Sequence, residues 1–306
     1  MSPISDEGKV WFEGKIVDWD EAKIHIMSHV AHYGSGVFEG IRSYDTPEGA
    51  AIFRLREHID RLLASAKCYR MDIPHTKEEL IDACREVVKA NGLRDAYIRP
   101  IAFRDAPSRG LFALDKPVKV AIGTWPWGKY LGEAYTKGAR CIVSSWRRIS
   151  PYALPTISKA CGHYLNSQLA RMEAYEKGCD EAIMLDYRGY VSEGTGENIF
   201  LVRDGDIYTP PMEASILVGI TRDTVMKLAD DSDYPIHERN ILHPELYVAD
   251  EVFLTGTAAE VTPVVEVDNI KIGDGKPGPI TRALQKKYED VVRGRIKRYR
   301  KWLTYA

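Results

Sequence analysis

The sequence of 306 residues predicts an α/β fold of the α+β type, built as two domains with a cleft between them. Three observations lead to this prediction. The chain is about twice as long as a typical domain, short apolar runs alternate with segments of helical periodicity, and no repeat period interrupts them. Hydrophobic residues make up 44% of the chain, which is an ordinary composition for a globular protein.

Residues 1–124 are expected to form a small α+β domain. An opening hairpin is predicted at residues 10–17, where two short apolar runs flank Glu13-Gly14. Helices are predicted at residues 56–70, from apolar residues at helical spacing, and from Thr76, whose capping box with Glu79 precedes a second amphipathic stretch. The strands and the polar loop that complete this domain are expected at residues 96–103, 104–116 and 118–123.

Residues 125–136 are predicted to be the loop between the domains, because Pro and Gly interrupt an aromatic stretch there. Residues 137–306 are expected to form a larger domain in which strands and helices continue to alternate. Its strands are predicted at residues 139–145, 181–186, 190–192, 198–202, 252–254 and 264–267, and its helices at residues 160–177, from Thr221 and from Pro279.

Charge and hydropathy argue against several classes of partner. Lys and Arg total 42 against 44 Asp and Glu, so broad nucleic-acid binding is not expected. Eight basic residues fall within residues 286–301, but Glu289 and Asp290 interrupt them, which favours a solvated helix face. No apolar run approaches the length of a membrane span, no signal peptide is recognisable, and the five cysteines form no CxxC pair. A cytoplasmic protein that binds neither nucleic acid nor membrane is therefore expected.

The motifs of several enzyme classes are absent. The sequence contains no P-loop and no GxGxxG, HExxH or GxSxG pattern. His25, His29 and His32 have spacings that could place three imidazoles on one helix face, but no carboxylate or thiol cluster is close in sequence. Turn packing and hydrogen bonding are the favoured explanation of these histidines, and no metal site is predicted.

Four segments of the second half carry residue types that suit one kind of ligand. Lys159 lies among small residues, and a desolvated lysine has the lowered pKa of an amine nucleophile. Glu193 precedes a glycine-rich turn, where a carboxylate could approach a flat ring and keep a pyridinium nitrogen protonated. Residues 219–222 and 256–260 offer amides and threonine hydroxyls to a phosphate. Each signal alone has an ordinary explanation: a surface lysine, a hairpin with a solvated Glu197, or helix caps.

Tyr97 and Arg99 are a further candidate in the first half. Residues at positions i and i+2 of a strand face the same side, so the phenol and the guanidinium would point together. Such a pair suits a carboxylate, which arginine can bind through two hydrogen bonds. A structural ion pair at a strand edge explains these two residues equally well when they are taken alone.

The lysine, the acid and the two turns together suit an aldehyde, a ring and a phosphate, and with them the sequence resembles the branched-chain amino-acid aminotransferases. These are class IV, fold-type IV enzymes that depend on pyridoxal 5'-phosphate. The resemblance covers nearly the whole chain, from WFEG at residues 11–14 to the last helix. Its most specific segments are residues 29–42 (HVAHYGSGVFEGIR), 56–58 with Arg61, 96–100 (AYIRP), 190–198, 219–223 and 256–263 (GTAAEVTP). It implies an active site in the cleft between the two domains.

The resemblance implies a role for each matching residue. Lys159 resembles the catalytic lysine that bonds the cofactor and later moves a proton. Tyr164 resembles the residue that hydrogen-bonds the cofactor's phenolic oxygen, and Glu193 the acid that faces the ring nitrogen. The other implied cofactor contacts are Arg61, Gly196, Leu217, Gly219, Ile220, Thr221, Gly256 and Thr257. The implied substrate contacts are Tyr33, Phe38, Tyr97, Arg99, Trp127, Thr257 and Ala258.

The implied activity is transamination of leucine, isoleucine or valine with 2-oxoglutarate, which gives 2-oxo acids and glutamate. Tyr97 and the turn amides of residues 257–258 would bind the substrate α-carboxylate, and Arg99 would pair with the distal carboxylate of glutamate. The aromatic members of the substrate set would form an apolar pocket, part of it lent by a neighbouring subunit. The family therefore implies a homodimer at least, with a hexamer as the alternative.

Two departures from the family pattern leave the substrate range open. The loop at residues 104–116 is not glycine-rich and is expected to bring Arg104 and Arg109 near the pocket. Cys161 and His163 stand where the family suggests smaller or amide residues. The alternatives on the same fold are a D-amino-acid aminotransferase, an (R)-amine transaminase and an aminodeoxychorismate lyase. A catalytically idle pyridoxal-phosphate carrier is disfavoured, because the lysine, the acid and both phosphate turns are present.

Overall fold

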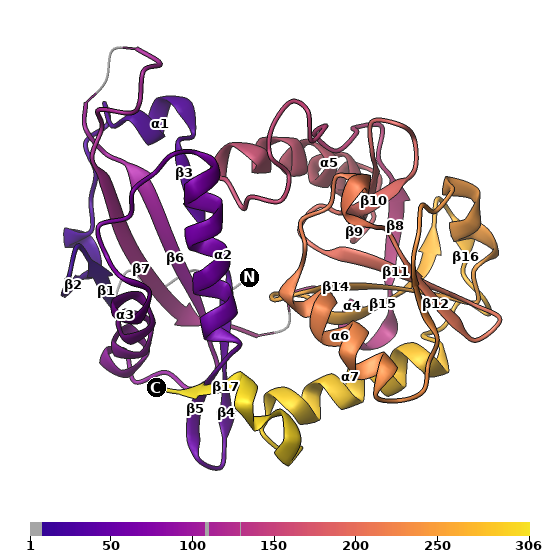
Figure 1. The fold of residues 1–306 in the computed structure, drawn as a ribbon. Coiled ribbons are helices and arrows are strands. Elements are labelled where there is room, and N and C mark those ends of the chain that lie inside the picture. The colour runs from indigo at the N-terminus through magenta and orange to yellow at the C-terminus, as the bar shows by residue number, and fades with distance from the viewer. Residues whose placement is uncertain (1–7, 108–109, 129) are drawn as a thin grey trace. The chain divides into compact units, whose positions relative to one another are not determined.

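The structure, a computed structural model, describes residues 8–107, 110–128 and 130–306. The chain divides into two compact units (Figure 1). Unit 1 comprises the described residues of Met1–Gly128, Ser158–Gly162 and Val291–Ala306, and unit 2 those of Lys129–Ile157 and His163–Asp290. Both units mix helices and strands, so the α/β class predicted from the sequence is confirmed.

Unit 1 is built on an antiparallel sheet with the strand order β17-β5-β4-β6-β7-β1-β2, and β3 lies beside β6. The hairpin of β6 (Ala96–Arg104) and β7 (Val118–Pro126) forms its centre, with Ile98 opposite Thr124. The remaining strands are β1 (Lys9–Phe12), β2 (Lys15–Asp18), β3 (Gly36–Phe38), β4 (Ile41–Thr46), β5 (Gly49–Phe53) and β17 (Leu303–Tyr305).

Helices α2 (Leu55–Cys68) and α3 (Lys77–Ala90) enclose one hydrophobic core with this sheet. The predicted capping box is confirmed, because the Thr76 hydroxyl accepts the Glu79 N–H while the Glu79 carboxylate accepts the Thr76 N–H. The short helices of unit 1 are η1 (Trp19–Glu21), α1 (His29–Tyr33) and η5 (Lys297–Trp302). The core holds the central strands rigidly, and these strands carry several candidate site residues.

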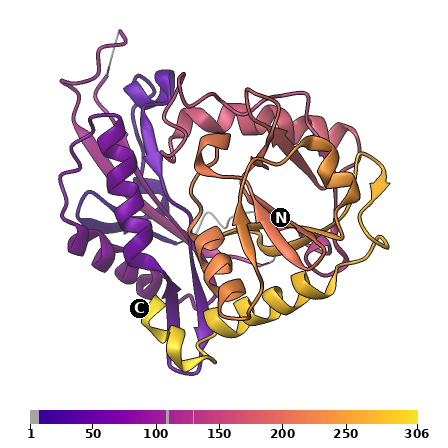
Figure 2. The same cartoon turned by 45° about the vertical axis from the view of Figure 1, so that its right-hand side comes forward.

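Unit 2 is built on a mixed sheet (Figure 2). Its strand order is β10-β9-β8-β15-β14-β11-β12-β13, and β16 pairs with β15. Strand β8 runs parallel to β9 and β15, and β12 runs parallel to β13. The strands are β8 (Ala139–Val143), β9 (Glu181–Leu185), β10 (Val191–Gly194), β11 (Asn198–Arg203), β12 (Asp206–Thr209), β13 (Ile236–Glu238), β14 (Glu251–Gly256), β15 (Glu260–Val267) and β16 (Ile270–Lys271).

The helices that accompany this sheet are short or of moderate length. They are α4 (Ala134–Lys137), η2 (Cys161–His163), α5 (Tyr164–Glu176), η3 (Met212–Ala214), α6 (Ile220–Asp230), η4 (His243–Val248) and α7 (Pro279–Val292). The main core of unit 2 consists largely of strand residues, and a smaller apolar cluster lies beneath α5. Within the described residues, no helix has the length and apolar character that a membrane crossing requires.

Three local predictions differ from the structure. The strands at residues 36–53 were not predicted, because β3 and most of β4 are buried on both faces and so lack an alternating pattern. The helix expected at residues 160–177 begins only at Tyr164, after the 3₁₀ turn η2. Residues 257–259 are the turn of the β14–β15 hairpin and not a helix cap.

Two segments from the second half of the chain belong to unit 1, which differs from the predicted division at residues 125–136. Strand β17 pairs with β5, with Leu303 opposite Phe53. Ala160 forms an isolated bridge with Val37 of β3. These pairings join residues that are far apart in the sequence, and local composition carries no signal for them.

Candidate active site

Lys159 lies in unit 1, in a non-helical segment directly before η2. Its carbonyl accepts the Phe38 N–H at 3.0 Å, and its own N–H donates to the Ser65 hydroxyl at 3.0 Å. The Nζ atom lies 5.0 Å from the centroid of the Phe38 ring. The position of this half-buried lysine is therefore set by β3 and α2, and not by the helix start that the sequence suggested.

Arg61, on α2, is oriented by a fully buried carboxylate. Its Nε and Nη2 donate to Glu39 Oε1 and Oε2 at 2.6 and 2.9 Å, and His58 Nδ1 lies 2.8 Å from Oε2. Burial raises the pKa of Glu39, but the charge and hydrogen bonds of Arg61, with those of His58, outweigh it and hold this pKa well below its usual range. Burial also lowers the pKa of His58, against the opposing charge and hydrogen bond of Glu39.

The sequence analysis assigned no role to Glu39 or His58. Both residues fall within segments that carry the family resemblance, and this was the available signal. An ionised Glu39 that binds the guanidinium through two hydrogen bonds restricts Arg61 to one orientation.

Tyr97 and Arg99 lie on the same side of β6. Arg99 Nη2 donates to the Tyr97 hydroxyl at 3.4 Å, and its guanidinium carbon lies 4.8 Å from the Phe38 ring and 5.7 Å from the Trp125 ring. Tyr97 in turn packs against Trp125 and Trp127, with ring centroids 5.3 and 4.9 Å apart. The Arg99 Nε is buried without a hydrogen-bond partner among the described residues. This aromatic cluster therefore surrounds a cation that has an unused donor, and Trp125 is a member that the sequence analysis missed.

Gly40 leaves the space that the Tyr97 phenol occupies, because a Cβ at this position would lie 1.9 Å from the phenolic oxygen. The remaining predicted substrate residue of unit 1, Tyr33, is the last residue of α1 and is not on the sheet. Its side chain is 42% exposed, and its ring lies 4.7 Å from that of His29. The sheet therefore brings together Phe38, Tyr97, Arg99 and Trp127, whereas Tyr33 projects from a separate helix.

In unit 2, Glu193 lies on β10 with its carboxylate held by three donors. Oε1 is 2.8 Å from Arg148 Nη2, and Oε2 accepts from Asn198 Nδ2 at 3.1 Å and from the Leu217 N–H at 3.0 Å. Asn198 Nδ2 also donates to the Leu217 carbonyl at 2.8 Å. Both Glu193 and Arg148 are buried. Arg148 and Asn198 are functional candidates that the sequence analysis missed, because their link to Glu193 is purely spatial.

Both predicted phosphate turns lie near this carboxylate. Gly219 is the N-cap of α6, where no side chain caps the helix, and Ile220 and Thr221 are the first helical residues. Gly256 ends β14, whose Thr255 pairs with Asn198, so Thr257 and Ala258 follow at the same end of the sheet. The exposed Gly196 belongs to the turn between β10 and β11, and a Cβ on Gly256 would lie 3.3 Å from its carbonyl oxygen.

Unit 2 therefore gathers most of the predicted cofactor residues through Asn198 and the β11–β14 pairing. Tyr164, half-buried, is the first residue of α5. Arg222, next to Thr221, serves a structural purpose, since its Nη2 donates to the Pro210 carbonyl at 3.0 Å and to Glu238 at 2.7 Å.

Two interpretations of charged residues are wrong. Arg104 was expected near the pocket, but it is buried and donates to the carbonyls of Ala113, of Lys116 at 3.3 Å, and of Tyr69 at 3.1 Å. It ties the following loop to the end of α2, because buried carbonyls need donors. Arg109 lies outside the described residues. The ordinary explanation offered for Glu197, a hairpin with a solvated carboxylate, does not hold, because Glu197 is only 4% exposed.

The histidines with metal-like spacing each make a local contact. His25 Nδ1 accepts the Met27 N–H at 3.0 Å, His29 Nδ1 lies 2.6 Å from the Ser35 hydroxyl, and His32 Nε2 lies 3.1 Å from the Ile26 carbonyl. In the part of the chain that the structure describes, no group of three or more His, Cys, Asp and Glu side chains is placed to hold a metal ion.

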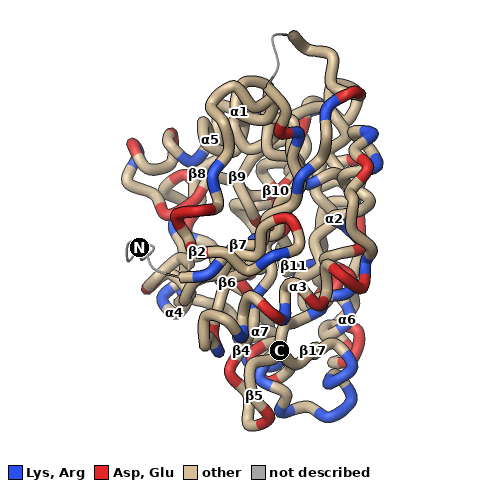
Figure 3. The backbone as a smooth tube through the Cα atoms, turned by 90° about the vertical axis from the view of Figure 1, so that its left-hand side faces the viewer, with Lys and Arg blue, Asp and Glu red and all other residues tan. Residues whose placement is uncertain are grey.

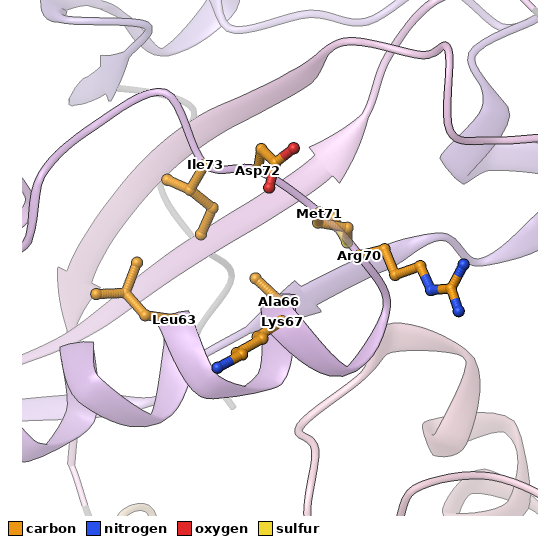
Figure 4. A pocket seen from close by; sticks show the side chains of 7 residues that line it. All are labelled: Leu63, Ala66, Lys67, Arg70, Met71, Asp72 and Ile73. Atoms are coloured by element: carbon orange, nitrogen blue, oxygen red, sulfur yellow. The ribbon is translucent and has the colours of Figure 1, made fainter.

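Unit 1 also contains a cavity of about 440 Å³ along α2 and the turn after it (Figure 4). Its lining residues are Leu63, Ala66, Lys67, Arg70, Met71, Asp72 and Ile73. None of these residues was predicted to bind cofactor or substrate. The candidate cofactor and substrate residues described above are therefore not among those that line the cavity.

The comparisons with known proteins agree on one family. The model of the class IV amino-transferases matches residues 36–267. A branched-chain-amino-acid aminotransferase of Pseudomonas aeruginosa is 48% identical over 305 residues, which cover 99% of both chains. Among solved structures, the branched-chain aminotransferase of Thermoproteus uzoniensis with norvaline has a TM-score of 0.94 and 47% identity, over 97% of this chain and 99% of that one.

The structure of a third relative has been solved with a form of the cofactor. The T.th. branched-chain amino acid aminotransferase with pyridoxamine 5'-phosphate has a TM-score of 0.95 and 48% identity, over 98% of each chain. The same enzyme is also known in complex with N-(5'-phosphopyridoxyl)-L-glutamate, at a TM-score of 0.93 and 47% identity over 98% of each chain. These relatives are similar to the chain over nearly its full length, and the family model matches most of it. The chain therefore belongs to the class IV amino-transferases.

Proposed function

We propose that this chain is a pyridoxal 5'-phosphate-dependent transaminase that transfers the amino group of leucine, isoleucine or valine to 2-oxoglutarate. The observation that carries the proposal is the position of Lys159, whose backbone is held between β3 and α2 in a chain closely similar to branched-chain aminotransferases. The products are the branched 2-oxo acids and glutamate.

The residues present fit such a cofactor. Glu193 is buried but receives a guanidinium and two further donors, which suits an ionised acceptor for a protonated ring nitrogen. The start of α6 has no side-chain cap, so its amides suit a phosphate, and the fixed guanidinium of Arg61 adds charge. When bound, pyridoxal phosphate supplies a ring that takes up the electrons released at the substrate Cα.

The candidate residues would divide the tasks of such a reaction among them. Lys159 would hold the cofactor and would move a proton at the substrate Cα, and Tyr164 would donate to the cofactor's phenolic oxygen. Leu217 would pack against the ring. The residues assigned to the phosphate or to the turns that approach it are Arg61, Gly196, Gly219, Ile220, Thr221, Gly256 and Thr257.

The aromatic cluster around Arg99 explains how one pocket could accept two kinds of side chain. The rings of Phe38, Tyr97 and Trp127 offer apolar contact to a branched side chain. Arg99 has a buried donor without a partner, which suits the distal carboxylate of glutamate. Tyr97 and the amides of residues 257–258 would bind the α-carboxylate that all substrates share, with Tyr33 adding to the apolar wall.

The visible absorption spectrum of the purified protein with pyridoxal phosphate tests this function. We expect the yellow band of the lysine-bound cofactor, its conversion by L-leucine to the colourless amine form, and its return with 2-oxoglutarate. Lys159→Ala should lack the band, whereas the control Lys137→Ala, an exposed lysine paired with Glu133 at 2.7 Å, should keep it. A band that responds only to D-alanine or to an (R)-amine would overturn the substrate assignment. A wild-type protein without the band would overturn the cofactor assignment.

We further propose that the chain works as a homodimer at least. Leu165, Leu169 and Met172 form a stripe on one face of α5, with exposed fractions of 66, 37 and 52%. In unit 1, Ile26 and Phe112 are 74% and 67% exposed. An exposed apolar stripe such as that on α5 marks a protein interface.

Light scattering coupled to size-exclusion chromatography tests this assembly. Met172→Glu should shift the protein toward the monomer, because a charge would be buried in the interface. The control Ile270→Glu alters another exposed apolar residue, 43% exposed, and should leave the mass unchanged. A monomeric wild type would contradict the proposal, and six subunits would assign the hexamer.

A cytoplasmic location without nucleic acid or membrane partners completes the proposal. All five cysteines are free thiols, as a reducing compartment favours. Acidic and basic residues are interspersed along the chain (Figure 3). Within the basic segment at residues 286–301, Lys286 pairs with Asp290 and Arg300 with Glu48, each at 2.8 Å. Retention on a heparin column at physiological salt would contradict this part of the proposal.

A further inference from the structure

Two buried carboxyl groups lie behind the turn that follows Glu193, and the proposed reaction does not use them. Glu181, on β9, is fully buried, and Glu197, directly before β11, is 4% exposed. Burying an ionised carboxylate is costly unless a cation or several donors compensate it. The contacts of these two groups therefore decide in which protonation state they exist.

Both carboxyl groups hold consecutive residues of the same turn. Glu197 Oε2 accepts the Gly196 N–H at 3.0 Å, and Glu181 Oε1 accepts from the Thr195 hydroxyl at 2.7 Å. A Cβ on Gly194 would lie 2.8 Å from Glu197 Oε2, so the carboxyl group also occupies the space beside that residue. The turn at residues 194–196 therefore rests on Glu181 and Glu197.

The Glu197 side chain also reaches the second turn of the candidate site, which follows Gly256. A Cβ on Gly256 would lie 3.4 Å from Glu197 Cγ, so Glu197 packs between the turn at residues 194–196 and the hairpin that contains Thr257. A change in the charge of Glu197 would thus act on both turns and, through Gly194, on the strand that carries Glu193.

The charges around the pair do not balance unless a proton is bound. Arg148 pairs with Glu193 at 2.8 Å, and Arg171, on α5, lies 3.6 Å from Glu181. Among the described residues the structure gives Glu197 no ion pair. Cys141 of β8 is a further titratable neighbour, and its thiol is kept neutral because burial raises its pKa. Three carboxyl groups therefore face two guanidinium groups.

The hydrogen bonds lead to the same conclusion. Glu181 Oε2 is buried, lies 3.6 Å from Arg171 Nη1 and accepts no hydrogen bond from the described residues, so it can still accept an O–H. Burial, with the charge of Glu181, raises the pKa of Glu197 to about 8. Burial likewise raises the pKa of Glu181 against the opposing charge of Arg171.

We propose that Glu181 and Glu197 share one proton at neutral pH, and that this neutral pair is a positioning device that holds the turn at residues 194–196 and with it the Glu193 carboxylate. The assignment rests on the proposed function only in giving Glu193 the task of meeting a ring nitrogen. Loss of the proton leaves two like charges behind the turn, and their repulsion loosens both the turn and the position of Glu193.

The direction in which stability changes with pH follows from the raised proton affinity of Glu197. The usual pKa of a glutamate is 4.5, and that of Glu197 in the folded protein is about 8. The folded state therefore holds a proton that the unfolded state has released. The stabilising contribution of the pair is complete below about pH 4.5 and is lost as the pH rises to about 8.

Urea unfolding across this pH range, with the purified protein as it stands, tests the shared proton. Relative to Glu197→Gln, whose amide cannot ionise, the wild-type unfolding equilibrium constant should rise roughly tenfold per pH unit between about pH 5 and about pH 8. The control Glu133→Gln, at a carboxylate that is 82% exposed, should follow the wild type. If the unfolding free energies of wild type and Glu197→Gln changed in parallel with pH, the shared proton would be overturned.

Infrared difference spectroscopy of the wild type provides a second measurement that does not depend on whether the variants fold. The carbonyl band of a protonated carboxylic acid should be present at neutral pH and disappear in alkali. The variant that carries both Glu181→Gln and Glu197→Gln should lack it at neutral pH, because neither side chain can then hold the proton. Absence of the band from the neutral wild type would overturn the proposal.

The positioning role has its own test in the protein loaded with pyridoxal phosphate. As the pH is raised, the visible absorption band of the wild type should change, with a midpoint near the pH at which the Glu181–Glu197 pair loses its proton. The band of Glu197→Gln should show no such change. If the infrared band is present while the two visible titrations coincide, the positioning role is overturned and the shared proton stands. The urea and infrared measurements need no cofactor, so their outcome is independent of the proposed function.

Discussion

The candidate residues of unit 1 and unit 2 are held in different ways. In unit 1, side chains hold side chains: Glu39 and His58 orient Arg61, and three aromatic rings surround Arg99. In unit 2, backbone groups take part beside the side chains of Arg148 and Asn198. A backbone N–H reaches Glu193, and the candidate phosphate groups are the start of α6 and a hairpin turn.

This difference has a physical consequence. A side-chain cluster depends on the volume and charge of each member, so a single substitution removes a contact that no other residue can supply. A turn keeps its backbone donors whichever side chain is substituted, provided that the loop conformation survives. We therefore expect substitutions in unit 1 to produce the larger losses, and the following predictions test this expectation in decreasing order of effect.

Glu39→Gln should destabilise the folded protein more than any of the other substitutions below. It leaves the Arg61 guanidinium without its buried charge partner, which costs roughly 3–5 kcal/mol of unfolding free energy at neutral pH. Because the pKa of Glu39 is lowered, the pair contributes fully above about pH 4.5 and its contribution is lost as the pH falls below that value. Urea unfolding should show the difference from wild type narrowing in acid, and a small difference that is constant with pH would contradict the ion pair.

Gly40→Ala should cost roughly 1–3 kcal/mol, since overpacking forces the Tyr97 phenol to move. The KM for the amino acid should rise as well, because Tyr97 is assigned to the α-carboxylate. Gly123→Ala is the matched stability control. Gly123 lies on β7, beside the strand that carries Tyr97, and a Cβ there would meet Trp125 at an ordinary 3.7 Å. Equal stability losses in the two variants would argue against the proposed steric role of Gly40.

Asn198→Ala is the corresponding test in unit 2. It removes the donor shared by Glu193 and the Leu217 carbonyl, and about 1–2 kcal/mol should be lost. The Kd for pyridoxal phosphate should rise, whereas Asn166→Ala, which loses one hydrogen bond to the Arg147 carbonyl, should leave it unchanged. A loss larger than that of Glu39→Gln would reverse the comparison between the units.

Thr76→Ala should have the smallest effect. It deletes the N-cap of α3, far in sequence from any candidate residue, and costs about 1 kcal/mol. Thermal unfolding measures this loss, and kcat and KM should equal those of the wild type. An altered KM would show that α3 influences the aromatic cluster through the sheet.

Much of the local structure could be predicted from the sequence. The Thr76 capping box, the long β6–β7 hairpin and the start of α6 after Gly219 depend on residues within a few positions of one another. The placement of Tyr97 and Arg99 on one side of β6 follows from strand alternation alone. The strands at residues 36–53 escaped prediction because burial on both faces removes the alternation that identifies a strand.

The family, and with it the kind of chemistry, was already determined by the sequence, because short motifs carry the residue types that one cofactor and its substrates require. Only the tertiary structure decided which groups hold those residues. Glu39 against Arg61, Arg148 against Glu193, and the burial of Glu197 beside Glu181 all join residues from separate elements. The protonation state of such groups depends on burial and on nearby charges. Both are set by long-range packing, and no local pattern in the chain reports them.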